Sequence, residues 1–189
     1  PMNNRRIVIT GLGCIAPNGN SVGEFWNALT SGISGLGPIS RFDAENLPSR
    51  IAGEVLDFTP EARLSAKDLR RMDRVIQFGM IRGMEAFEDS GLDLSDEERE
   101  LSGVLIGAGI GGIETIEDTT RAMTAGQKKV SPFYIPSSII NMISGNLSIE
   151  LGLKGPNLAI TTACSTGTHC IGIAARLIAF GDATVMIAG

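Results

Sequence analysis

The chain contains few histidine, aromatic and cysteine residues. Its 189 residues include one histidine and one tryptophan, and aromatic residues make up 5%. The three cysteines form no CxxC pair, and an odd number without a signal peptide indicates a reducing, cytoplasmic setting. No apolar run reaches the roughly 18 residues of a membrane helix, and the net charge of -5 argues against nucleic-acid binding. We therefore expect no nucleic-acid or membrane partner and no metal.

Apolar segments alternate with amphipathic ones along the chain. We take Pro1 as foreign to the natural start and expect one domain over residues 2–189. Strands are predicted at residues 5–10, 102–109, 156–163 and 183–189, with a possible strand at 51–55. Helices are predicted between Ser21 and Gly32, and at residues 73–90, 112–126, 137–152 and 164–181. Apolar strands alternating with helices predict an α/β fold with a mainly parallel sheet.

Two glycine-rich runs raise the possibility of a nucleotide site. GLGCIA at residues 11–16 and GAGIGG at residues 107–112 both follow predicted strands. The first is interrupted by Pro17, and neither is followed by an acidic residue closing a second strand about 20 residues on. We interpret both runs as loops in close backbone packing beside a cavity, with a nucleotide-binding α/β domain as the alternative.

Cys164 lies in TTACSTGTHC, where a predicted strand becomes a predicted helix. At a helix start, free backbone N–H groups and the helix dipole stabilise a thiolate, the reactive form for thioester exchange. The alternative is a small core residue, the common fate of a free cysteine. His169 lies five residues on, about 140° around the helix and about 7.5 Å along it, so a local hydrogen bond is expected in place of a role as base. Cys170 and Cys14 are expected to serve packing.

Basic residues gather at two places despite the acidic balance. Lys67, Arg70 and Arg71 have the spacing that shares one helix face, and Lys128 and Lys129 form a second cluster. The residues alone fit two interpretations of these clusters: a solvated surface, or a surface that binds an acidic partner.

Long ordered motifs resemble the β-ketoacyl-[acyl-carrier-protein] synthases, especially the synthase II branch that elongates fatty acids. They are RRIVITGLGCIAPNGNSVGEFW, RFDAENLPSRIAGEV, RRMDRVIQFG, IGAGIGG, SPFYIPSSIINM, and TTACSTGTH with its flanks. The resemblance implies a thiolase-like fold, here the N-terminal half of a five-layer α-β-α-β-α architecture, in a homodimer. It implies no cofactor.

The resemblance also implies roles for particular residues. Cys164 would accept the acyl group from acyl-carrier protein, with its backbone N–H as half of an oxyanion hole. Ile110 would edge the acyl cavity, and Phe133 and Tyr134 would lie near the dimer contact, one of them reaching the partner's acyl pocket. The carrier protein would dock at Lys67, Arg70 and Arg71, and we assign Lys128 and Lys129 to the same role.

The chain departs from the family pattern in one respect. The family uses two histidines in HGTGT-like and GHLLGAAG-like contexts, a lysine, and a Gly-Phe-Gly-Gly segment for decarboxylation and gating, and none of these motifs is present. We therefore expect the N-terminal part of a longer enzyme, inactive in condensation by itself. A non-catalytic half resembling a chain-length factor is an alternative, although such factors usually replace the active cysteine.

Overall fold

The computed structural model describes residues 5–189, and packing divides the chain into two compact units. Unit 1 contains the described residues up to Gly11 together with Pro60–Gly189, and unit 2 contains Leu12–Thr59. Unit 1 holds the residues that the sequence places at the site. It is the part of the molecule from which the site is built.

A three-stranded parallel sheet forms the centre of unit 1. Its strands are β3 (Ser102–Leu105), β4 (Asn157–Leu158) and β5 (Val185–Ala188), in the order β4-β3-β5. β3 pairs parallel with both neighbours, so that Val104 is aligned with Ile187 and Leu105 with Leu158. Strands joined by helical crossovers pair in this way, and the α/β prediction is confirmed.

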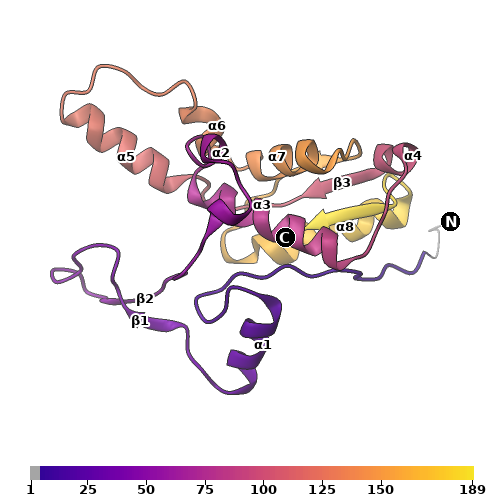
Figure 1. The fold of residues 1–189 in the computed structure, drawn as a ribbon, viewed down its shortest axis with the longest axis horizontal. Coiled ribbons are helices and arrows are strands. Elements are labelled where there is room, and N and C mark those ends of the chain that lie inside the picture. Colours follow the sequence, from indigo (N-terminus) through magenta and orange to yellow (C-terminus); the bar gives the residue numbers. More distant parts are fainter. Residues whose placement is uncertain (1–4) are drawn as a thin grey trace. The chain divides into compact units, whose positions relative to one another are not determined.

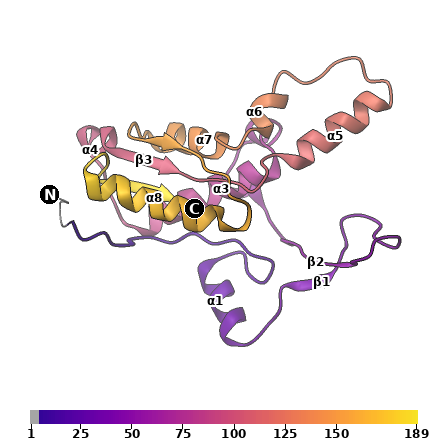
Figure 2. The same ribbon diagram turned by 180° about the vertical axis from the view of Figure 1, so that it is seen from behind.

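Three long helices pack on this sheet. α3 (Arg74–Asp89) lies along α7 (Met142–Leu151), α7 also contacts β3, and α8 (Thr166–Phe180) contacts β5 and β3. Figures 1 and 2 show α7 and α8 on opposite sides of β3. All four residues of β3 are buried. Helices therefore cover both faces of the central strand, as the largely apolar run from Gly103 to Ala108 predicts.

The α3–α7 contact depends on two glycines one helical turn apart. A Cβ built on Gly79 would lie 2.3 Å from Cγ2 of Ile143, and one on Gly83 would lie 2.3 Å from Cδ2 of Leu147. Ile143 and Leu147 are also one turn apart and are almost wholly buried. The side chains of α7 thus occupy the space that two missing side chains leave on α3.

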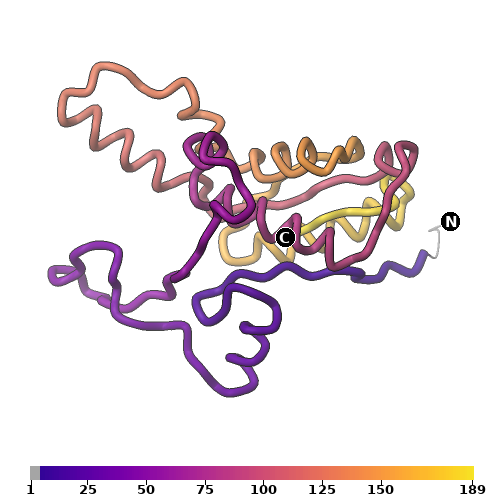
Figure 3. The backbone as a smooth tube through the Cα atoms, viewed as in Figure 1, coloured from indigo at the N-terminus to yellow at the C-terminus, as the bar shows by residue number. Residues whose placement is uncertain are grey.

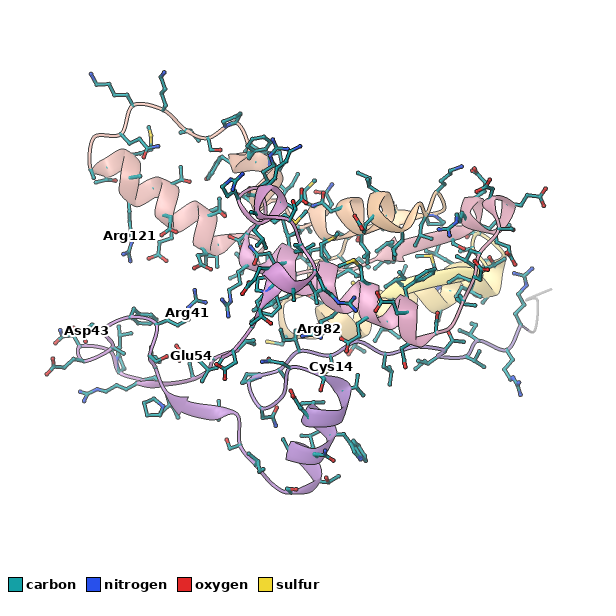
Figure 4. All side chains as sticks on the ribbon, in the orientation of Figure 1. Cys14, Arg41, Asp43, Glu54, Arg82 and Arg121 are labelled. Atoms are coloured by element: carbon teal, nitrogen blue, oxygen red, sulfur yellow. The ribbon has the colours of Figure 1, made fainter. Side chains whose placement is uncertain are left out.

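Further elements complete the two units. In unit 1 these are η1 (Pro60–Ala62), α2 (Ala66–Leu69), α4 (Asp96–Glu100), α5 (Ile113–Thr124) and α6 (Tyr134–Ser138). Unit 2 contains α1 (Val22–Thr30) and an antiparallel pair, β1 (Leu36–Pro38) with β2 (Ile51–Gly53). After β2, the Glu54 carboxylate accepts hydrogen bonds from Ser40 and from the backbone N–H of Arg41, and these bonds lower the pKa of Glu54 (Figure 4).

Several predicted boundaries are wrong. Residues 5–10 form an extended, exposed trace without a strand partner among the described residues (Figure 3), because β-branched sequence favours a strand but only a neighbour supplies the ladder. β4 keeps only Asn157–Leu158 of its predicted range. The predicted helix over residues 137–152 is divided between α6 and α7, and α6 begins at Tyr134, before the predicted start.

The helical stretch from Ala163 to Phe180 is more apolar than we expected. Its 18 residues have a mean hydropathy of 1.2, enough by length and composition to cross a membrane, so the expectation that no run reaches this limit is wrong. Core helices of soluble proteins meet the same criterion. Here one face of the helix packs on β3 and β5, whereas only 17% of the stretch is buried.

Candidate active site

Cys164 occupies a strained turn between β4 and α8. The turn is a 3₁₀ helix, η2 (Ala163–Ser165), so the α-helix proper begins two residues later than the predicted start. Ala163 has φ of 51°, a left-handed conformation that costs a residue with a Cβ roughly 1–3 kcal/mol. Cys164 is exposed. The turn therefore presents the thiol to solvent at the N-terminal end of a 15-residue helix.

Neighbouring hydroxyl groups stabilise this turn. The Oγ1 of Thr166 donates to the carbonyl of Ala163 at 2.8 Å and accepts from the backbone N–H of Thr162 at 2.9 Å. The Oγ of Ser165 donates to the carbonyl of Thr162 at 2.8 Å. The hydroxyl residues around the cysteine thus supply hydrogen bonds that hold the backbone in its left-handed bend.

A buried serine fixes the strand ends that lead into the site. Ser144 of α7 is 0% exposed. Its Oγ lies 3.0 Å from the backbone N of Ile106, which donates to it, and donates to the carbonyl of Leu158 at 2.7 Å. Ile106 follows β3 and Leu158 ends β4, so one hydroxyl joins the two chains where the parallel ladder stops.

The second glycine run lies directly against the cysteine turn. A Cβ on Gly107 would lie 2.1 Å from the carbonyl oxygen of Ile160 and 2.5 Å from Cγ2 of Thr166. The Thr161 hydroxyl donates to the carbonyl of Ala108 at 2.9 Å. The expectation of close backbone packing is confirmed for this run, and Ile110, 66% exposed, projects from the same loop.

The first glycine run also begins in close packing. A Cβ on Gly11 would lie 2.0 Å from the carbonyl oxygen of Ala86 in α3. Cys14, in the same run, is half-buried and reduced. Among the described residues, no group of three or more His, Cys, Asp or Glu side chains has the arrangement to hold a metal ion.

His169 and Cys170 take local roles. The Nδ1 of His169 lies 3.4 Å from the Oγ1 of Thr162, the kind of local contact that the sequence predicts. Cys170 is 0% exposed, which confirms packing. Burial raises the pKa of the Cys170 thiol, although hydrogen bonds with the backbone at Ile160 and Gly107 oppose the rise. Of these two neighbouring cysteines, only Cys164 is open to a reagent.

The aromatic pair belongs to a different group of elements. Tyr134 begins α6, which packs on α5 and α7, whereas the Cys164 turn directly precedes α8. Phe133 precedes α6, and the guanidinium carbon of Arg71 lies 4.2 Å from the centre of its ring, within the range of a cation–π contact. The structure thus joins Phe133 to one of the predicted docking residues.

The basic cluster at residues 67–71 is less regular than its spacing predicts. α2 is a single turn ending at Leu69, so Arg70 caps it and Arg71 lies beyond it. Lys67 and Arg70 are exposed, whereas Arg71 is half-buried against Phe133. Lys128 and Lys129 are exposed in the loop after α5. Four of the five predicted docking residues are therefore accessible, and the fifth, Arg71, already contacts Phe133.

Sequence reasoning missed two residues that organise the site. Asp73 was expected only as the start of a helix, yet its carboxylate also bonds to a second helix, at Thr115. Ala163 gave no signal at all, because its left-handed backbone follows from the surrounding hydrogen bonds. An acidic residue before an apolar periodic run does predict a helix cap, and this is the only local sign of the role of Asp73.

Comparison with known proteins identifies the class. The family model "Beta-ketoacyl synthase, N-terminal domain" matches residues 4–189, and the chain belongs to this family. Solved structures agree: a β-ketoacyl synthase from Burkholderia phymatum superposes with a TM-score of 0.79 at 26% identity, over 96% of this chain and 45% of that one. A type II PKS acyl-carrier protein in complex with its ketosynthase gives a TM-score of 0.77 at 26% identity, over 96% and 49%.

Curated relatives point to one branch of the family. The chain is 52% identical, over its whole length and 46% of the relative, to 3-oxoacyl-[acyl-carrier-protein] synthase 2 of Vibrio cholerae. It is 43% identical to the protein of the same name from Staphylococcus aureus, over 98% of this chain and 45% of the relative. The chain thus spans about half the length of the curated relatives that it matches.

Proposed function

We propose that the chain is the acyl-accepting part of a β-ketoacyl-[acyl-carrier-protein] synthase of fatty-acid elongation. The observation that carries the proposal is the exposed thiol of Cys164, held on a strained turn at the start of α8. The 43–52% identity to proteins named 3-oxoacyl-[acyl-carrier-protein] synthase 2 supports the same function. A cytoplasmic setting is part of this proposal.

The first half-reaction is transfer of the acyl group to Cys164. The Cys164 thiolate attacks the carbonyl carbon of the acyl thioester, a new carbon–sulfur bond forms, and the bond to the carrier thiol breaks. The carrier leaves as a thiolate and takes up a proton. Negative charge develops on the carbonyl oxygen, where the backbone N–H of Cys164 supplies one of two donors. The N-terminus of α8 favours both this charge and the attacking thiolate.

The second half-reaction requires groups that this chain does not contain. Malonyl-carrier protein loses carbon dioxide, and the resulting carbanion attacks the Cys164 thioester to form a β-ketoacyl product. We assign the two histidines, the lysine and the gating segment of this step to the remainder of a longer enzyme, because the chain holds only His169. Residues 2–189 then form an incomplete thiolase-like N-terminal domain that cannot condense by itself.

The architecture and partners follow from the same proposal. The sheet and its helices would form half of a five-layer α-β-α-β-α arrangement within a homodimer. Ile110, Phe133 and Tyr134 would contact the acyl chain, and Lys67, Arg70, Lys128 and Lys129 would receive the acidic carrier protein. Exposed apolar side chains on α8, including Ile171 and Phe180, provide surface for the missing half to cover. No cofactor is involved.

A chain-length-factor role is the second candidate. A chain from a solved ketosynthase/chain length factor structure superposes with a TM-score of 0.78 at 28% identity, over 95% of this chain and 45% of that one, so the fold does not separate the two functions. An accessible Cys164 favours the catalytic one. The nucleotide-binding alternative is disfavoured because backbone and side-chain atoms fill the space beside Gly107.

Mass spectrometry of the full-length protein tests the proposal. We expect incubation with octanoyl-carrier protein to add one octanoyl group to the peptide containing Cys164. A Cys164→Ala variant, with Cys14 and Cys170 intact, should add none. Failure of the wild-type protein to form this thioester would refute the proposed function and support the chain-length-factor alternative.

A further inference from the structure

One buried carboxylate caps two helices at once. Asp73 is 6% exposed and precedes α3. The N–H of Val75 in α3 donates to its Oδ1 at 3.1 Å, and the N–H of Thr115 in α5 donates to its Oδ2 at 2.8 Å. α5 begins at Ile113, and its N-cap residue, Gly112, has no side chain that could cap the helix. Asp73 therefore supplies, from 42 residues away in the chain, the cap that α5 lacks.

The helix that Asp73 caps is the continuation of the loop beside Cys164. That loop, residues 107–112, is fixed at its first end by Gly107 and Ala108, which pack on the cysteine segment. Its second end is fixed near Asp73: a Cβ on Gly112 would lie 3.0 Å from the Asp73 Cβ. The N–H of Gly112 donates to the carbonyl of Ser138 at 2.8 Å. Ile110 projects from between these two fixed ends.

The same carboxylate lies next to the basic cluster. Arg70 and Arg71 precede Asp73 by three and two residues. The Ser137 hydroxyl donates to the carbonyl of Arg71 at 2.8 Å, and the Arg71 side chain covers Phe133. The segment from Arg70 to Asp73 thus connects the exposed basic turn to the loop that carries Ile110.

We propose that Asp73 is a positioning residue for the acyl site: by capping α5 it sets the position of Ile110, and with it the preference for acyl chain length. The inference rests on the proposed function, in which Cys164 holds the acyl group and Ile110 contacts the acyl chain. Asp73 does not contact the substrate in this proposal. It acts through the loop, which moves when the start of α5 is released.

Two variants of the full-length protein disrupt the capping of α5 by Asp73, one at the acceptor carboxylate and one at the Thr115 donor. Asp73→Asn replaces one acceptor oxygen with an NH₂ group, so only one of the two helix caps survives. Thr115→Pro removes the donor N–H while leaving Asp73 to cap α3, at a first-turn position where proline is tolerated. Ser95→Ala is the matched control, because it removes the side-chain cap of α4 and its capping box.

The measurement is the ratio of Cys164 acylation rates with octanoyl- and dodecanoyl-coenzyme A, probes that bypass the carrier protein. We expect both variants to change this ratio by roughly three- to tenfold. Ser95→Ala should leave it within about twofold, since a remote cap affects stability without moving Ile110.

The outcomes separate this inference from the function on which it rests. If the wild-type protein is not acylated, the proposed function fails first. If it is acylated and folded variants keep the wild-type ratio, Asp73 only stabilises the fold. The proposal is also overturned if Ser95→Ala changes the ratio equally, or if neither site variant folds while Ser95→Ala does.

Discussion

Ile143 of α7 packs directly against Gly79 of α3: a Cβ on the glycine would lie 2.3 Å from Cγ2 of the isoleucine. Ile143 is 2% exposed and has little room to withdraw. The close approach of these helices places Ser144, the next residue of α7, against the ends of β3 and β4. The geometry of the Cys164 segment therefore depends on a contact remote from the thiol.

Gly79→Ala should destabilise the protein. The added methyl forces Ile143 away and costs roughly 1–3 kcal/mol, partly offset by about 1 kcal/mol of better helix propensity. Gly145→Ala is the matched control in α7, because a Cβ there meets only Sδ of Met142 at 3.9 Å. Urea denaturation should show a loss for Gly79→Ala and an unchanged or raised stability for Gly145→Ala. Equal stabilities would show that the helices separate without cost.

Iodoacetamide should distinguish Cys164 from Cys170 in the folded protein. Cys164 is exposed, whereas burial raises the pKa of Cys170 and lowers its thiolate fraction near neutral pH. Each unit of such a rise reduces the reactive form about tenfold, in addition to the steric protection. Peptide mapping should find Cys164 labelled first, and Cys170 only as pH rises or after unfolding. Prior labelling of Cys170 at pH 7 would contradict the site.

The Arg63–Glu88 pair should make a small, pH-dependent contribution to stability. Arg63 donates to both carboxylate oxygens, at 3.0 and 2.6 Å, and this hydrogen bonding holds the pKa of Glu88 below its ordinary 4.5. Since the folded pKa is the lower one, the stabilisation is present above pH 4.5 and is lost as the pH falls through the folded value.

The size of that contribution is limited by solvent. The side chains are 39% and 58% exposed, so we expect at most about 1 kcal/mol. A double-mutant cycle with Arg63→Gln and Glu88→Gln should give this coupling at pH 7 and a progressively smaller one as the pH falls below 4.5. A coupling that persists in acid would assign the interaction to packing in place of charge.

Charge reversal should test the carrier surface. Lys67→Glu combined with Arg70→Glu in the full-length protein should weaken binding of acyl-carrier protein by roughly tenfold or more at low salt. Alkylation of Cys164 should be unchanged. Because salt screens exposed charges, the difference from wild type should shrink as salt rises. Arg50→Glu in unit 2 is the control, and equal weakening by that variant would indicate a general effect of net charge.

Parts of the fold could be predicted because their causes are local. Apolar residues between Ile76 and Phe87 recur at helical spacing. This spacing predicts a helix, and α3 covers these residues. Ser21 caps α1 through the N–H of Glu24, as the spacing of the two indicates. The Glu24 carboxylate, however, bonds to the backbone of Asn20 instead of completing a capping box, because the turn before α1 presents that N–H.

By itself the sequence determined the alternation of strand and helix, the family, and the position of the reactive cysteine, because periodicity, capping and motif order act over a few neighbouring residues. Tertiary structure decided which distant residues contact one another. It left residues 5–10 without a strand partner in the described part of the chain, placed Arg71 over Phe133, and brought Asp73 to Thr115. These are pairings between distant parts of the chain, and their energy depends on atoms that only folding brings within reach of one another.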